Sequence, residues 1–135
     1  METNETSNPT RSIGQIDKTC EVEQILIEFP KIPLAIVGSG DLFTALLTSW
    51  LTRSGGNNWP CDMDIPLALE KTVATMQAVL NRTLLYYYQC ESSNADYMQI
   101  SAMKELRIVQ SRDDILNPKI VHRAVKWNVL RRLRM

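Results

Sequence analysis

The sequence predicts an α/β fold with a few strands, packed helices and an incomplete central sheet. Two short β-rich segments, residues 23–29 and 32–37, come first. Two later segments, residues 41–51 and 66–89, carry apolar side chains three or four positions apart, which is typical of helices. So few strands make too small a sheet to cover two long apolar helices. The chain of 135 residues is long enough for one domain with one core.

The first part of the chain changes from polar to strand-like. Residues 1–19 are polar and aperiodic, and we expect a disordered leader there. In residues 23–29 the side chains of Ile25, Ile27 and Phe29 share one face of an expected strand, which Pro30 closes. The second apolar segment, residues 32–37, runs into a tight glycine turn. The expected domain covers residues 20–126, and residues 127–135 form a basic tail.

The rest of the chain is expected to be mainly helical. A helix begins with Asp41 as its N-cap and ends near Gly55 and Gly56. A second helix runs from about Pro66 to Gln89, because proline is tolerated in a first turn. Residues 91–104 are interpreted as a polar loop. A last strand around residues 106–108 and a terminal helix from residue 118 complete the predicted order.

Composition excludes several classes of protein. The formal net charge is +0, whereas a nucleic-acid binder needs a basic surface. No apolar run approaches the roughly 20 residues of a membrane span. The three cysteines have no CxxC spacing, so neither a disulfide framework nor a zinc site is indicated. We therefore expect a cytosolic protein with no nucleic-acid or membrane partner and no metal-ligating residues.

The glycine turn is the motif that carries chemistry. Gly38 and Gly40 allow a close approach of the backbone to a phosphate, and Ser39 lies between them. The following helix would point its free N–H groups and its dipole at the anion. An acidic residue beside a phosphate is unfavourable for simple binding. Asp41 is reasonable there if it removes a proton from an attacking hydroxyl.

The same four residues have a second interpretation. A GxGD sequence before an apolar run is also an ordinary way to begin a helix, with Asp41 capping the first N–H groups. The two interpretations are compatible, because one carboxylate can cap a helix and later accept a proton. Local sequence alone favours the capping interpretation.

A family resemblance supports the catalytic interpretation. The segment IVGSGDLFTALL at residues 36–47 resembles the GTGDLFAALL segment of pyridoxal kinases, in the ribokinase-like superfamily. The resemblance continues in order through LEKTV at 69–73, VLNRT at 79–83 and ELRIVQSRDDI at 105–115. The resemblance implies the C-terminal part of a ribokinase-like α/β fold.

The resemblance also implies an activity and its residues. The family transfers the γ-phosphate of ATP to the 5′-hydroxyl of pyridoxal, pyridoxine or pyridoxamine, with Mg²⁺ and K⁺ as activator, and as a homodimer. Asp41 would be the catalytic base and would contact the substrate together with Val37. Gly38, Ser39 and Gly40 would bind the transferred phosphate, with Ser39 in place of the usual threonine. The residues that fall where the family lines its adenine pocket are Ile32, Phe43, Met76 and Leu80.

The chain departs from the family in what it lacks. The resemblance covers about residues 22–121, and the family's first strands, its lid and its upstream phosphate and metal contacts are missing. We therefore expect little or no kinase activity from the isolated chain. The alternative is a non-catalytic fragment that pairs with, or regulates, a full-length kinase, since an incomplete sheet leaves an open edge.

Overall fold

The structure is a computed structural model that describes residues 23–58, 62–91 and 96–127. The expected leader, residues 1–19, and all but the first residue of the expected tail lie outside these ranges. The described part is mixed α/β, mostly helical, with one two-stranded sheet. Its elements in chain order are β1 (Gln24–Leu26), α1 (Ser39–Gly55), the 3₁₀ helix η1 (Gly56–Asn58), α2 (Ile65–Glu91), α3 (Tyr97–Met103), the 3₁₀ helix η2 (Val109–Ser111), α4 (Arg112–Leu116) and β2 (Val125–Trp127).

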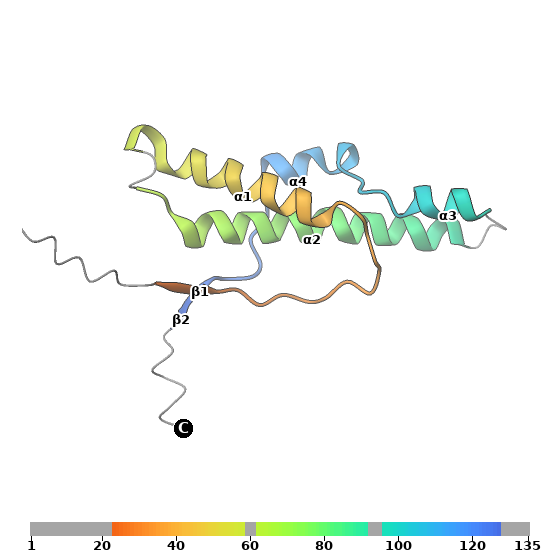
Figure 1. Cartoon of the computed structure of the whole chain (residues 1–135), viewed down its shortest axis with the longest axis horizontal. Coiled ribbons are helices and arrows are strands. Elements are labelled where there is room, and N and C mark those ends of the chain that lie inside the picture. The colour runs from red at the N-terminus through yellow and green to blue at the C-terminus, as the bar shows by residue number, and fades with distance from the viewer. Residues whose placement is uncertain (1–22, 59–61, 92–95, 128–135) are drawn as a thin grey trace, which may run out of the picture.

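The two long helices form the main layer of the molecule. α1 and α2 lie side by side along its long axis, and α3 and α4 pack against α2 (Figure 1). α2 begins after Asp64, whose carboxylate accepts the Leu67 N–H at 3.0 Å and so caps the helix. The buried apolar side chains belong to these two helices: Leu46 of α1, and Ala68, Val73, Met76 and Val79 of α2. Burial of a Leu, Val or Met side chain stabilises a fold by about 1.5–3 kcal/mol, so the packing of α1 against α2 supports the fold.

The sheet joins two distant parts of the chain. β1 and β2 pair antiparallel, with Gln24 opposite Trp127 and Leu26 opposite Val125. Lys126 of β2 forms an ion pair with Glu23, whose carboxylate raises the pKa of the ammonium group above its ordinary value. The strands lie beside α2 and below it in Figure 1, away from α1. The sheet therefore holds the two ends of the described chain together.

Hydrogen bonds fasten the segment around η2 and α4 to one face of α2. The Arg82 guanidinium donates to the Ser111 hydroxyl at 3.1 Å and forms a 2.7 Å ion pair with Asp114. The Thr83 hydroxyl accepts the Arg107 N–H at 3.1 Å, and Ser111 returns a bond to the Arg107 carbonyl at 2.7 Å. Because Thr83 and Ser111 are fully buried, the bonds to their hydroxyl groups are largely shielded from water, whereas the Arg82–Asp114 ion pair is exposed.

The structure confirms part of the predicted element order. Both long helices are present within a few residues of their expected ends, and the first strand is present but only three residues long. The segment 32–37 is irregular, so the second predicted strand is wrong. The expected loop at 91–104 contains α3, and the expected strand at 106–108 is irregular chain that leads into η2. The expected terminal helix is also wrong over the described residues, which end in β2.

Thr83→Val is expected to destabilise the fold by about 1–3 kcal/mol, because it leaves the partly buried Arg107 N–H without an acceptor. The two side chains have the same shape, so no cavity contributes. Thr72→Val is the matched control: Thr72 is equally buried, but its hydroxyl only donates to the Ala68 carbonyl one turn earlier. Denaturant unfolding of both variants tests this, and equal losses of stability would contradict it.

Candidate functional site

The glycine turn lies at the beginning of α1. Gly38 occupies the position before the first helical residue, with φ +85° and ψ 0°, and its carbonyl accepts the Leu42 N–H at 3.0 Å. Gly38 is one of two described glycines with positive φ; the other, Gly56, follows the end of α1. A left-handed residue at this point turns the irregular segment 32–37 into the helix. The turn therefore has the form that the motif predicts.

The backbone N–H groups after this turn are available to a ligand. The first N–H groups of a helix have no partner inside it. Those of Ser39, Gly40 and Asp41 donate no hydrogen bond to any described residue. A Cβ atom at Gly40 would meet nothing within 4 Å, so the space beside the turn is open. Together with the helix dipole, these groups make a site that favours a small anion.

Asp41 is not the N-cap of α1, and that prediction is wrong. The helix begins two residues earlier, at Ser39, which makes Asp41 the third helical residue. Its side chain is exposed and accepts no hydrogen bond from a described residue. In the first turn, the carboxylate has a favourable interaction with the positive end of the helix dipole. The Asp41 carboxylate therefore lies in the same helical turn as the N–H groups of residues 39–41, and none of them has a hydrogen-bond partner among the described residues.

Ser39 uses its hydroxyl within the turn. The hydroxyl donates to the Ile36 carbonyl at 3.3 Å, and this bond helps to fix the approach to Gly38. The oxygen keeps its lone pairs for a further interaction. Val37, between these two residues, is 90% exposed. Its side chain is therefore open to contact with a molecule above the turn.

The four expected adenine-pocket residues come from three different places. Ile32 lies in the irregular segment before the turn, and Phe43 lies on α1. Both are half-buried, as is Leu80 on α2. Met76, one turn before Leu80, is 8% exposed and belongs to the core between the helices. The described contacts do not join the four into one pocket, and each remains a prediction from the resemblance.

The structure adds one neighbour that the motif could not indicate. A Cβ atom at Gly38 would lie 3.5 Å from Leu106, so the segment after α3 packs directly against the turn. Arg107, the next residue, is fastened to Thr83 of α2. The only sequence signal for this contact is the presence of both segments in the resemblance. α2 therefore supports the turn through residues 106–107.

Gly38→Ala is expected to destabilise the fold by about 1–2 kcal/mol, because an L-residue is strained at this positive φ. Gly40→Ala is the matched control in the same turn. Gly40 is helical with open space at its Cβ, so alanine should stabilise α1 by about 0.5–1 kcal/mol. Thermal unfolding of the two variants measures the opposite shifts. A gain in stability from Gly38→Ala would contradict the left-handed turn.

No group of three or more His, Cys, Asp or Glu side chains in the part of the chain that the structure describes lies close enough to hold a metal ion. Among the described helices, none is both long and apolar enough to cross a lipid bilayer.

The chain is homologous to pyridoxal kinases. It is 39% identical to the pyridoxal kinase of Arabidopsis thaliana over 84% of its own length, and 40% identical to that of Homo sapiens over 76%. The pyridoxal kinase of Sus scrofa is 37% identical over 80% of the chain. The chain spans about a third of the length of these relatives, covering 33%, 30% and 31% of them, which is consistent with a C-terminal portion. No protein-family model matches it.

Proposed function

We propose that this chain carries the phosphoryl-transfer turn of a pyridoxal kinase in the vitamin B6 salvage reaction of the cytosol. The reaction is the ATP-dependent phosphorylation of pyridoxal, pyridoxine or pyridoxamine at the 5′-hydroxyl, which yields pyridoxal 5′-phosphate from pyridoxal. One observation carries the proposal: the Asp41 carboxylate lies in the first turn of α1 with three backbone N–H groups, and none of these groups has a hydrogen-bond partner among the described residues. The names of the homologous kinases supply the reaction class.

The turn has the parts that such a transfer needs. Asp41 accepts the proton of the attacking hydroxyl, whose oxygen forms a bond to the γ-phosphorus while the bond to the leaving ADP oxygen breaks. The N–H groups of residues 39–41 stabilise charge on the transferred group. Gly38 and Gly40 keep the backbone free of Cβ atoms at this point, and Val37 contacts the substrate. The exposure of Val37 and the open space at Gly40 support these roles.

The proposed binding of ATP and the proposed use of Mg²⁺ and K⁺ rest on different observations. Ile32, Phe43, Met76 and Leu80 are proposed to contact the adenine of ATP, and for Phe43 and Leu80 their partial exposure supports it. ATP would bring Mg²⁺ with it, and K⁺ is the proposed activator. The described residues do not fit a resident metal site, since they contain no cluster of metal-ligating side chains. No step of the reaction is therefore assigned to a metal held by this part of the chain.

The architectural part of the proposal is a C-terminal portion of a ribokinase-like fold over residues 20–126. It has a leader at 1–19 and a basic tail at 127–135, and the complete enzyme is proposed to be a homodimer. The mostly helical α/β arrangement with one small sheet is consistent with a portion of such a fold.

The isolated chain is expected to be inactive, because about two thirds of the length of its relatives has no counterpart here. Without the residues that face the turn across the active site in the relatives, the turn cannot both hold the substrate and exclude water. The assay is pyridoxal 5′-phosphate formation from ATP and pyridoxal by the purified 135-residue chain. Robust turnover that Asp41→Ala abolishes would contradict the expected inactivity while supporting the role of Asp41.

A second candidate function is a non-catalytic partner of a full-length kinase. Its support is the strong exposure of valine side chains near the turn and in the last third of the chain: Val37 at 90%, Val109 at 84% and Val121 at 77%. Where exposed apolar side chains form a contiguous patch, the patch is typical of a surface that another chain covers. Co-elution of this chain with an intact pyridoxal kinase would support this function. A chain that remains a stable monomer beside the kinase would contradict it.

A further inference from the structure

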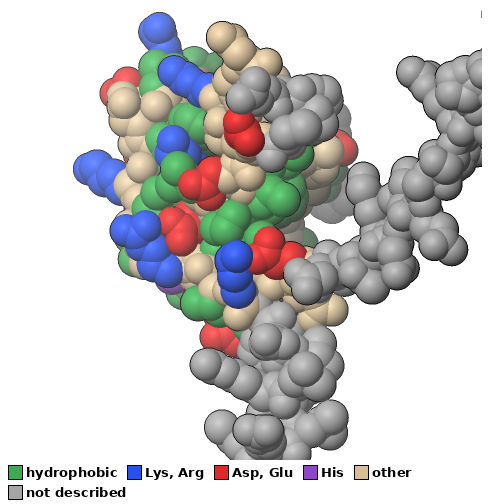
Figure 2. Space-filling model, turned by 90° about the vertical axis from the view of Figure 1, so that its left-hand side faces the viewer, with side chains coloured by type: hydrophobic (Ala, Val, Ile, Leu, Met, Phe, Trp, Pro, Cys, Tyr) green, Lys and Arg blue, Asp and Glu red, His purple; other side chains and the backbone are tan. Residues whose placement is uncertain are grey.

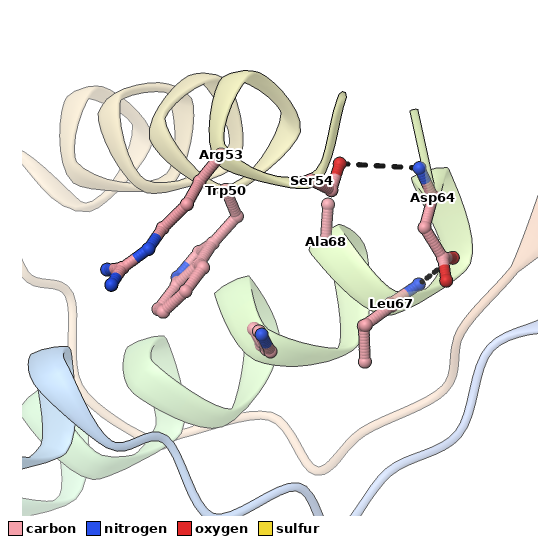
Figure 3. A pocket seen from close by; sticks show the side chains of 7 residues that line it. Trp50, Arg53, Ser54, Asp64, Leu67 and Ala68 are labelled. Atoms are coloured by element: carbon pink, nitrogen blue, oxygen red, sulfur yellow. Dashed lines mark hydrogen bonds between the residues drawn. The ribbon is translucent and has the colours of Figure 1, made fainter. Parts of the chain in front are cut away.

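A hollow with cationic and aromatic lining lies at the opposite end of α1 from the glycine turn. It has a volume of about 370 Å³ and opens between the last turns of α1 and the first turns of α2 (Figure 3). Its lining residues are Trp50, Arg53, Ser54, Asp64, Leu67, Ala68 and Lys71. Arg53 is twelve positions after Asp41 on the same helix, roughly 18 Å along its axis at 1.5 Å per residue. The hollow is therefore separate from the proposed phosphoryl-transfer turn.

Two positive side chains share one indole ring in this hollow. The Lys71 ammonium lies 4.5 Å from the centroid of the Trp50 ring, and the Arg53 guanidinium carbon lies 5.6 Å from it. Neither cation forms a salt bridge with a described acidic residue. Two cations held near one ring repel each other, and an anion between them would relieve that repulsion. The indole orients both side chains but does not neutralise them.

The one acidic residue of the lining is directed elsewhere. The Asp64 carboxylate accepts the Leu67 N–H at 3.0 Å, and the Asp64 backbone N–H donates to the Ser54 hydroxyl at 3.3 Å. Figure 3 shows Asp64 with its carboxylate toward Leu67, on the side away from Arg53 and Trp50. Asp64 thus serves the start of α2, and the cationic side of the hollow keeps its excess positive charge.

The lining also selects the kind of anion. A guanidinium binds an oxyanion through two parallel N–H bonds, and an ammonium adds a point charge, which is a combination suited to a phosphate group. The indole of Trp50 and the side chain of Leu67 add apolar surface beside the charges. In Figure 2, Lys and Arg side chains lie among apolar and acidic side chains at the end of the molecule where β1 and the start of α2 lie. The hollow is also several times larger than a phosphate ion needs.

We propose that this hollow binds a small organic phosphate, with the phosphate group between Arg53 and Lys71 and the apolar part against Trp50. The site is independent of the proposed kinase reaction. It would be a second phosphate site, at the end of α1 opposite the glycine turn.

The test is a titration of the full chain with phenyl phosphate, followed through the indole N–H resonance of Trp50, which Trp50→Phe identifies. Saturable shifts are expected, with weaker binding of inorganic phosphate and no shift with phenol. Arg53→Gln and Lys71→Gln should each weaken binding about tenfold or more, because each removes a charged hydrogen bond to the ligand. Arg112→Gln, which removes an exposed base on α4, is the matched control and should bind as the wild type.

Three outcomes would overturn the proposal. The first is no saturable shift of Trp50 with phenyl phosphate. The second is undiminished binding by the Arg53→Gln and Lys71→Gln double variant, and the third is equal affinity for inorganic phosphate. Circular dichroism of the same samples reports whether each variant keeps its helices, so loss of fold is not mistaken for loss of the ligand.

Discussion

Asp41→Asn is expected to lower kcat by about 10²–10⁴-fold in a kinase that contains this turn, because an amide cannot accept the substrate proton. The isolated chain is not the material for this measurement, since we expect it to be inactive. A chimera supplies the missing part: residues 23–127 of this chain replace the matching portion of the Arabidopsis thaliana pyridoxal kinase, to which the chain is 39% identical. The assay follows phosphorylation of pyridoxal by ATP.

The prediction is specific because kcat should fall while KM for pyridoxal should change little. Asparagine has nearly the size of aspartate, and the Asp41 side chain has no described hydrogen-bond partner to lose. KM for pyridoxal should therefore change little while kcat falls. Asp113→Asn is the matched control, because it removes an exposed carboxylate from the first turn of another helix, α4. The same fall in both variants would show a general effect of charge.

Two outcomes of the chimera experiment would contradict the proposal. An Asp41→Asn chimera that keeps kcat within tenfold of its parent would remove Asp41 from the role of base. A folded chimera without any activity would show that this turn does not serve phosphoryl transfer even inside a complete enzyme. Both outcomes leave the phosphate hollow at the other end of α1 unaffected, because its test measures binding by the isolated chain.

The helices were predictable because their signal is local. Apolar residues at helical spacing in 41–51 and 66–89 specify α1 and α2, whose faces must bury against each other. The glycine turn was predictable for the same reason, since glycine readily tolerates the positive φ that Gly38 adopts. The N-cap was not predicted correctly, because the serine and glycine after Gly38 already adopt helical geometry.

The errors lie where distant partners decide the structure. Residues 106–108 alternate apolar and polar side chains as a strand does, yet the Arg107 N–H donates to the Thr83 hydroxyl and not to a neighbouring strand. β2 could not be foreseen, because its partner β1 lies about a hundred positions earlier in the chain. A tertiary contact of this kind overrides local propensity. The Leu106 contact with the turn and the charged hollow at Trp50 depend on the same long-range packing.

The structure gives a physical reason for the blocks of the resemblance to occur together. VLNRT supplies Arg82 and Thr83, and these bind Arg107, Ser111 and Asp114 in ELRIVQSRDDI. The second block in turn places Leu106 against Gly38 of the glycine turn. Apart from Leu80, which is proposed to contact the adenine of ATP, the residues of these blocks therefore support the turn by packing and hydrogen bonding. The role of these hydrogen-bonded residues in the described chain is architectural.

Glu70→Ala is expected to destabilise the fold by about 2–4 kcal/mol, the range for loss of a buried carboxylate with two charged hydrogen bonds. Glu70 belongs to the LEKTV block and its side chain is 8% exposed. Its carboxylate accepts the Arg123 guanidinium and the Ala124 N–H, both at 2.9 Å. Because Ala124 directly precedes β2, Glu70 is the link between α2 and the sheet.

Substitutions at both partners separate charge from packing. Glu70→Gln keeps the shape and one acceptor for the Ala124 N–H, so its loss of stability should be smaller than that of Glu70→Ala. Arg123→Ala leaves the buried carboxylate with one partner and should also destabilise the fold. Glu105→Ala, at an exposed glutamate, is the control and should change stability by less than about 0.5 kcal/mol.

Amide hydrogen exchange would show which element Glu70 holds. If it fastens the sheet, Glu70→Ala should speed exchange at Ile25 and Lys126, which face each other in the ladder, more than at Val79 in the centre of α2. Uniform acceleration would instead mean that Glu70 supports the helices directly. Unchanged exchange and unchanged denaturant midpoints would contradict the link altogether. The distinction matters for the turn, because the irregular chain from β1 to Gly38 is anchored at its start by this sheet.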